Sequence, residues 1–151
     1  MKLKNFAATL VAALTFGLLQ GAAVAQLTND IESDVPFSFM VGNKTMAAGR
    51  YVFHAADADT LEIHSATGQA AVIQAVIQAQ KGSAPKESEL VFHRIGKQEF
   101  LYQVFMQGNP LGVELEPSKA ERELEGKGMK GEMHSHPAKM HVGKSAKTKN
   151  S

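Results

Sequence analysis

Cysteine is absent from this chain of 151 residues. The protein therefore cannot be a small scaffold held by disulfide bonds, nor a lipoprotein that is acylated on cysteine. Its stability has to come from a hydrophobic core. Once the first 25 residues are set aside, the length is typical of one domain with a tail rather than of two domains.

Long apolar runs are also absent after the first 25 residues. Lys2 and Lys4 precede an apolar run, 6–19, and Ala23-Val24-Ala25 follows as a small-residue cleavage site. This is the pattern of an export signal. A retained membrane anchor is the alternative, but a spanning helix requires roughly 20 apolar residues. We predict that residues 1–25 are a signal peptide cleaved before Gln26, with no transmembrane segment afterwards and a periplasmic or extracellular destination.

Charge is unevenly distributed along the rest of the chain. Residues 26–125 hold 8 Lys and Arg against 14 Asp and Glu, a net charge of −6, whereas residues 126–151 hold 6 Lys and one Glu, a net charge of +5. Residues 127–151 contain no aromatic residue, Leu or Ile, so we predict a disordered basic tail. Such a tail suits an anionic surface or an envelope protein as partner. The acidic body disfavours nucleic acid.

Short apolar runs separated by turn signals fill residues 35–116, and residues 26–34 read as an N-terminal linker. In residues 35–41, Phe37, Phe39 and Val41 recur with period two on one face, which predicts a strand. Two longer runs, 89–95 and 99–106, flank Gly96-Lys97-Gln98 and form the clearest hairpin. The pattern predicts one all-β domain, either an antiparallel β-sandwich or a partly open barrel.

Two segments need separate treatment. In residues 70–79, Gln74 and Gln78 have helical spacing whereas the β-branched residues favour a strand, so both readings stay open and we choose a strand. For residues 117–126 we predict a short helix, because Ser118 and Glu121 have the spacing of a capping box. A helix this short is marginal alone, so it should dock on the body through Leu124.

Residues 35–44 read VPFSFMVGNK, and residues 46–53 read MAAGRYVF. This pair of segments resembles small exported bacterial β-domain proteins, in which a PF-x-F-x-V-G strand precedes an L-P-A-G-x-Y-x-V strand. Met46 and Ala47 stand where Leu and Pro are usual. The resemblance extends over residues 35–125. It implies a β-domain fold, and it implies no activity or catalytic residues.

Methionine and histidine gather near the C-terminus. Thioether sulfur suits Cu(I), and imidazole suits Cu(II), Ni(II) or Zn(II). A flexible segment could wrap such an ion without a preformed site. The alternative is a tail whose histidines have no particular role. The candidate metal ligands are Met133, His134, His136, Met140 and His141.

Other candidate sites lie in the body. His54, His64 and His93 could bind zinc if their strands met, but each lies next to a core-facing position and we expect all three to be exposed. Ser65 and Ser88 are candidate nucleophiles. No motif typical of hydrolases, metalloproteases or phosphate-binding loops is present, which favours a non-catalytic protein.

The sequence therefore predicts a binding or structural module of the bacterial cell envelope, in an unknown oligomeric state. An exposed strand edge in the fold would favour binding by strand addition. The alternatives are copper-type metal binding through the tail, and an enzyme with an unrecognised site near residues such as His93 and Arg94.

Overall fold

The computed structural model describes residues 30–68 and 71–141 of the chain. The predicted signal peptide lies outside these ranges. The described residues form ten strands and one helix. The strands are β1 (Ile31–Val35), β2 (Phe39–Val41), β3 (Lys44–Met46), β4 (Gly49–Ala55), β5 (Thr60–Ser65), β6 (Ala71–Gln80), β7 (Ser88–Ile95), β8 (Gln98–Phe105), β9 (Leu111–Leu115) and β10 (Gly131–Met140), and the helix is α1 (Lys119–Gly126).

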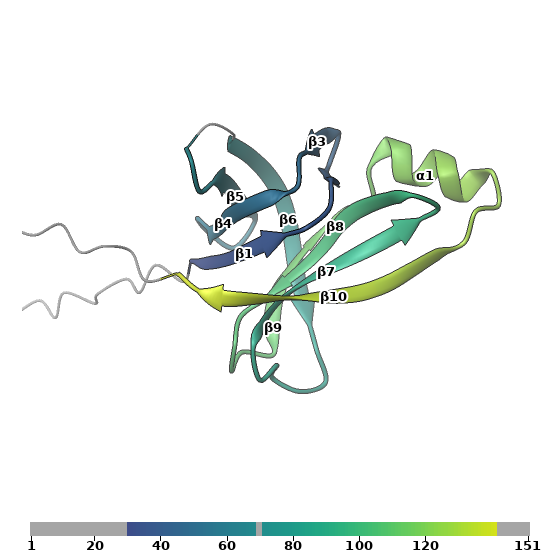
Figure 1. The fold of residues 1–151 in the computed structure, drawn as a ribbon. Helices are drawn as coiled ribbons and strands as arrows, with labels where there is room; N and C mark the ends of the chain where they lie inside the picture. The colour runs from purple at the N-terminus through teal and green to yellow at the C-terminus, as the bar shows by residue number, and fades with distance from the viewer. Residues whose placement is uncertain (1–29, 69–70, 142–151) are drawn as a thin grey trace, which may run out of the picture.

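The strands form one sheet in the order β3-β2-β8-β7-β10-β1-β4-β5-β6-β9, and an additional pairing of β8 with β9 closes eight of them into an antiparallel barrel. The all-β prediction is confirmed, and the architecture is a barrel rather than a sandwich. The β2–β3 hairpin is added at one end, where β2 runs parallel to β8. Figure 1 shows α1 beside the β7–β8 hairpin, on the side of the barrel opposite the start of β1 and the end of β10.

Two local predictions about strands are confirmed. The hairpin of β7 and β8 turns at Gly96, whose φ of 62° is readily adopted only by glycine. Residues 71–80 form a strand, β6, whose first half pairs with β5 and whose second half pairs with β9. Pairing with two different strands explains why this segment is long.

Large apolar side chains fill the barrel interior. They come from nearly every strand, and the aromatic rings of Phe39 and Phe92 meet edge to face at 5.5 Å. The cavity left among Ile31, Phe53, Val104 and their neighbours measures about 30 Å³, far less than the roughly 300 to 1,000 Å³ of typical ligand pockets.

The predicted N-terminal linker, 26–34, is wrong for its last residues, because β1 is a barrel strand that pairs with β4 along its whole length. The strand predicted from residue 35 to 41 is interrupted at 36–38, and only Phe39–Val41 form β2. The buried face of β1 consists of Ile31, Ser33 and Val35. One of these three inward side chains, Ser33, is polar, so the alternation of apolar and polar residues that indicates a strand is weak in this segment.

The prediction of a disordered tail is wrong for the described residues after α1, because β10 pairs with β7 over Gly131–Ala138. The prediction of disorder followed from the small number of apolar side chains in this segment. A strand inserted between two others is also stabilised by its backbone hydrogen bonds, and of the β10 side chains only Ala138 is fully buried. The end of the predicted tail, 142–151, lies outside the described residues.

The predicted helix and its capping box are confirmed. Ser118 caps α1 by accepting the N–H of Glu121, and the Glu121 carboxylate accepts the N–H of Ser118. The docking contact, however, is made by Glu121, whose side chain is buried against His93, while Leu124 stays partly exposed. A hydrogen bond between charged or polar groups thus replaces the apolar contact that we expected.

Candidate functional site

The ladder that joins β1 to β10 is the shortest of those that close the barrel. It has two residue pairs, Ile31 with Met140 and Glu32 with Lys139. One further backbone hydrogen bond, from the N–H of His141 to the carbonyl of Asp30, measures 2.7 Å. The next residue of β10 that should bond to β1 is Pro137, which has no N–H to donate. The ladder ends there.

Side chains replace the missing ladder at Pro137. The N–H and C=O of one strand residue point to the same side, so the bond from His141 to Asp30 shows that odd-numbered residues of β10 face β1. The hydroxyl of Ser33 donates to the Pro137 carbonyl at 2.8 Å. The Nε2 of His136 donates to the Asp34 carbonyl at 2.9 Å. Two side-chain hydrogen bonds therefore join β1 to β10 beside Pro137. We call the line along which β1 and β10 meet the seam.

Beyond this point β10 pairs on one side only. Residues Gly131–Ser135 pair with β7, whereas β1 pairs with β10 only at Met140 and Lys139. By the same alternation, the backbone N–H and C=O groups of Gly131, Met133 and Ser135 point away from β7. We call Gly131–Ser135 the open edge. In Figure 1 this part of β10, toward α1, has β7 beside it and no strand on its other side.

A groove of about 970 Å³ runs along the seam next to the open edge. Its lining includes Glu32, Asp34, Arg50, Glu87, His136, Lys139, Met140 and His141. A second recess, of about 510 Å³, shares Glu87, Ser88, His136 and Pro137 with it. Within the groove the Glu32 carboxylate contacts Arg50 at 3.3 Å and His141 at 2.7 Å. The groove therefore offers charges of both signs.

The five predicted metal ligands all lie on β10 or directly after it, and the structure does not bring them to one point. Their side chains alternate between the two faces of an extended strand. Among the described residues, no group of three or more His, Cys, Asp or Glu is placed to hold a metal ion. Metal binding by copper, nickel or zinc stays a prediction.

Each of the five has its own surroundings. The His134 ring stacks on Phe92 at 5.7 Å, and its Nε2 lies 2.6 Å from the Glu99 carboxylate. His136 donates to Asp34, His141 contacts Glu32, and the Met140 sulfur accepts a hydrogen bond from Ser88 at 3.7 Å. Met133 is 49% exposed on the outer face. Three of them, His136, Met140 and His141, line the groove.

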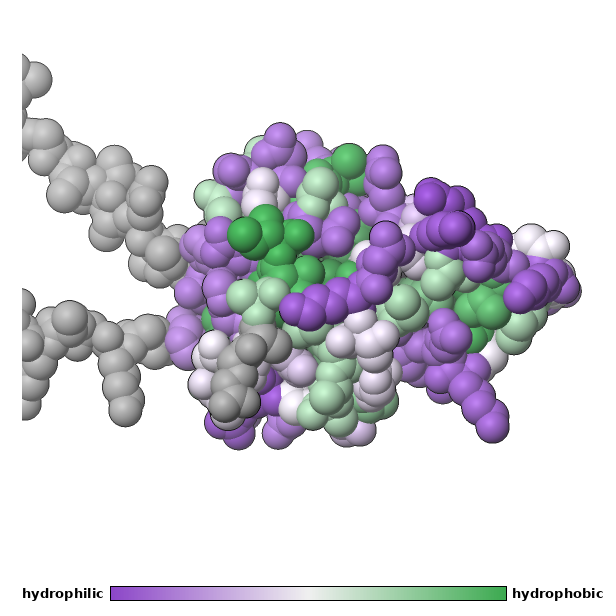
Figure 2. Space-filling model, turned by 90° about the horizontal axis from the view of Figure 1, so that it is seen from above, coloured by the Kyte–Doolittle hydropathy of each residue, from purple (hydrophilic) through white to green (hydrophobic). Residues whose placement is uncertain are grey.

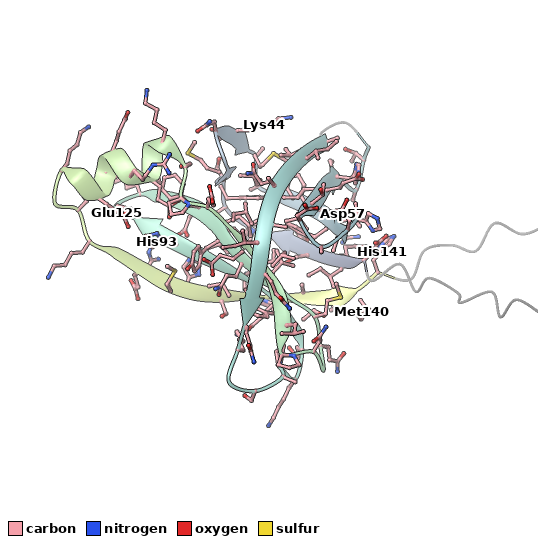
Figure 3. The ribbon with its side chains drawn as sticks, turned by 180° about the vertical axis from the view of Figure 1, so that it is seen from behind. Lys44, Asp57, His93, Glu125, Met140 and His141 are labelled. Atoms are coloured by element: carbon pink, nitrogen blue, oxygen red, sulfur yellow. The ribbon has the colours of Figure 1, made fainter. Side chains whose placement is uncertain are left out.

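The three body histidines each contact carboxylates of their own surroundings. The ring of His54 lies 2.5 Å from Asp30, and that of His64 lies 3.2 Å from Glu62. His93 contacts Glu121 of α1 and lies toward the opposite end of the molecule from His141 (Figure 3). The expectation that all three are exposed holds for His64, whereas His54 is half-buried and His93 is 8% exposed.

His93 forms a buried contact that the sequence did not reveal. Its Nδ1 lies 2.5 Å from Glu121, and its Nε2 lies 3.9 Å from Glu125. The ring occupies the space that a Cβ on Gly131 would fill. Burial, followed by a hydrogen bond to Glu114, raises the pKa of the neighbouring Tyr102. The capping spacing identified Glu121, but nothing local indicated that its second oxygen bonds a distant histidine.

The two candidate nucleophiles have structural partners. The Ser88 hydroxyl accepts the N–H of Gln107 at 3.0 Å and donates to the Met140 sulfur. The Ser65 hydroxyl pairs with Thr67 at 2.8 Å in a turn. Arg94 contacts Glu132 at 2.8 Å, which lowers the pKa of that carboxyl and raises the pKa of the guanidinium. His93 and Arg94 therefore contact different carboxylates, Glu121 and Glu132, and do not share one site.

The surface seen in Figure 2 is mainly hydrophilic, with smaller hydrophobic areas between the polar side chains. The largest exposed apolar side chains on β6 are Ile73 and Ile77. In the described part of the chain no helix has the length and apolar character required to cross a membrane. Comparison with family models, with curated proteins and with solved structures found no match to this chain.

Proposed function

We propose that the protein is a non-catalytic binding module of the bacterial cell envelope, which binds an extended segment of a partner along the open edge of β10. The observation that carries the proposal is the one-sided pairing of Gly131–Ser135. An unpaired strand edge is a template for another strand. The export signal at residues 1–25 supports the envelope as the compartment.

In binding by strand addition, the backbone of the open edge and the groove have different roles. The N–H and C=O groups of Gly131, Met133 and Ser135 would supply main-chain hydrogen bonds, which depend little on the partner's sequence. Side chains of the added segment would continue into the groove beside His136 and Glu32. The groove would then select the sequence that binds.

Proline at position 135 gives a specific test of this edge. The Ser135 N–H points away from β7, so Ser135→Pro removes a donor from the open edge and none from the β7–β10 ladder. Ser135→Ala keeps the N–H and is the matched control. Both variants should fold, which circular dichroism and thermal unfolding would verify.

The experiment selects binders from a displayed library of random linear peptides on the immobilised mature chain, 26–151. The selected peptides are then titrated against both variants by calorimetry. We expect binding to weaken at least about tenfold in Ser135→Pro, the equivalent of about 1.4 kcal/mol, and to be unchanged in Ser135→Ala. Peptides that bind Ser135→Pro as tightly as the wild type, or a library that yields no binder, would contradict the proposal.

A further inference from the structure

We infer that the partner of the open edge is the same edge of a second copy of this chain, paired antiparallel about a twofold axis at Met133. The inference rests on the proposed function in that it uses the same edge, and it names the occupant. Closed twofold dimers are the commonest assemblies of identical chains, and each contributes the same patch. Residues 131–135 therefore have to be complementary to themselves.

The open edge lacks the features that usually block edge pairing. Proteins protect exposed strand edges with lysine, proline or a bulge. On β10 those residues are Pro137 and Lys139, and both belong to the part that faces β1. The one acidic side chain of the open edge, Glu132, is held by Arg94 at 2.8 Å. The segment that pairs on one side only is thus the unprotected one.

Geometry selects the register. Only Gly131, Met133 and Ser135 direct their backbone groups outward, so an axis at one of these three residues passes through a hydrogen-bonded pair. An axis at Glu132 or His134 would pass through a non-hydrogen-bonded pair, with about four main-chain hydrogen bonds, and would place two Glu132 or two His134 side chains opposite each other. An axis at Ser135 would require Lys139, which already pairs with Glu32 of β1. An axis at Gly131 would require Met129, which precedes the strand. An axis at Met133 uses all three residues, with about six main-chain hydrogen bonds.

In this register the side chains are complementary. Glu132 lies opposite His134 of the second copy on both sides of the axis, so no two carboxylates face each other. The Met133 side chain, 49% exposed, meets its own symmetry mate and loses that exposure. Gly131 lies opposite Ser135, and neither of these two residues has a bulky side chain of its own. Charge, apolar contact and space all favour a second copy at this edge.

The first measurement is sedimentation equilibrium of the mature chain, 26–151, over micromolar to millimolar concentrations. We expect a monomer–dimer equilibrium with the dimer fraction rising with concentration. Met133→Pro removes the central N–H donor of the open edge and leaves the ladder with β7 intact. It should raise the dissociation constant of the dimer at least about tenfold. Met133→Leu keeps the N–H and should dimerise like the wild type. A wild-type chain that stays monomeric at millimolar concentration would overturn the inference.

The absence of cysteine permits a second measurement that does not depend on the proline variant. Hydrogen-bonded partners in antiparallel strands have Cα atoms about 5.5 Å apart, which suits a disulfide. Met133→Cys should therefore cross-link to itself under mild oxidation, much faster than Ser83→Cys in an exposed loop. Equal rates for the two variants would contradict the register.

The two proposals can fail separately. If the wild type is monomeric at every concentration while selected peptides still bind and are lost in Ser135→Pro, the dimer is wrong and strand addition stands. If Met133→Cys forms the dimer and no peptide competes with it, the edge serves self-association, and binding of other partners at this site is wrong.

Discussion

Gly131 is the residue on which the contact between α1 and the barrel depends. The His93 ring lies in the space that a Cβ at position 131 would occupy, and its Nδ1 contacts the Glu121 carboxylate of α1 at 2.5 Å. Glycine is required here by that close approach rather than by an unusual backbone angle, because its φ is outside the left-handed region. One missing methyl group thus allows the helix to dock through a buried polar pair.

Gly131→Ala should lower the free energy of unfolding by about 1 to 3 kcal/mol, because the added Cβ forces His93 away from Glu121. Gly82→Ala is the control, since a Cβ at position 82 meets no atom within 4 Å. Urea unfolding followed by circular dichroism measures both. Identical urea midpoints for the two variants would contradict this prediction, because they would show that the His93 ring can move without loss of stability.

At the scale of single elements, the helix α1 depends on its N-terminal cap. It spans only the 8 residues Lys119–Gly126, fewer than the roughly 12 that an isolated helix requires to be stable in water. Ser118 and Glu121 satisfy backbone donors that would otherwise lack partners at its first turn. The same Glu121 binds His93, so the cap and the docking contact support each other.

Ser118→Ala should therefore destabilise the protein by about 1 kcal/mol, since the N–H of Glu121 loses its acceptor. Hydrogen exchange should show the loss as faster exchange at Glu121, with amides of the β7–β8 hairpin little affected. Ser83→Ala, in an exposed loop, should leave both measurements unchanged. Uniformly faster exchange over the whole barrel would indicate that α1 does not open on its own.

Elements whose signal is local could be predicted from the sequence, and those stabilised by distant neighbours could not. The β7–β8 hairpin has its turn glycine and its alternation in one continuous stretch, and α1 has its capping spacing. The strand β10 has neither, because its stability comes from backbone bonds to β7 and β1. For the same reason the open edge could not be predicted, although His136, Met140 and His141 of the candidate set line its groove.

At the scale of the whole molecule, β10 connects the first strand of the barrel to β7. It supplies the His134 ring that stacks on Phe92 and lies 5.8 Å from Phe37. Without it, β1 and β7 would each have an unpaired edge next to an apolar interior. The C-terminal part of the chain is therefore as necessary to the barrel as the β7–β8 hairpin.

A chain ending at residue 126 should consequently lose its cooperative urea transition and aggregate, because the barrel cannot close. A chain ending at residue 141 retains every described strand and should unfold at the midpoint of the mature protein. Circular dichroism in urea distinguishes the two. A cooperative transition with an unchanged midpoint in the shorter chain would show that β10 is not part of the stable barrel.

The pairing of β1 with β10 also sets the order in which the molecule can form. Glu32 and His141 meet although they are 109 residues apart in the sequence, and such distant pairings form late because a long loop has to be closed first. A growing chain cannot complete the barrel until its last strand has been synthesised. Closure of the barrel is thus delayed until β10 is available to pair with both β1 and β7.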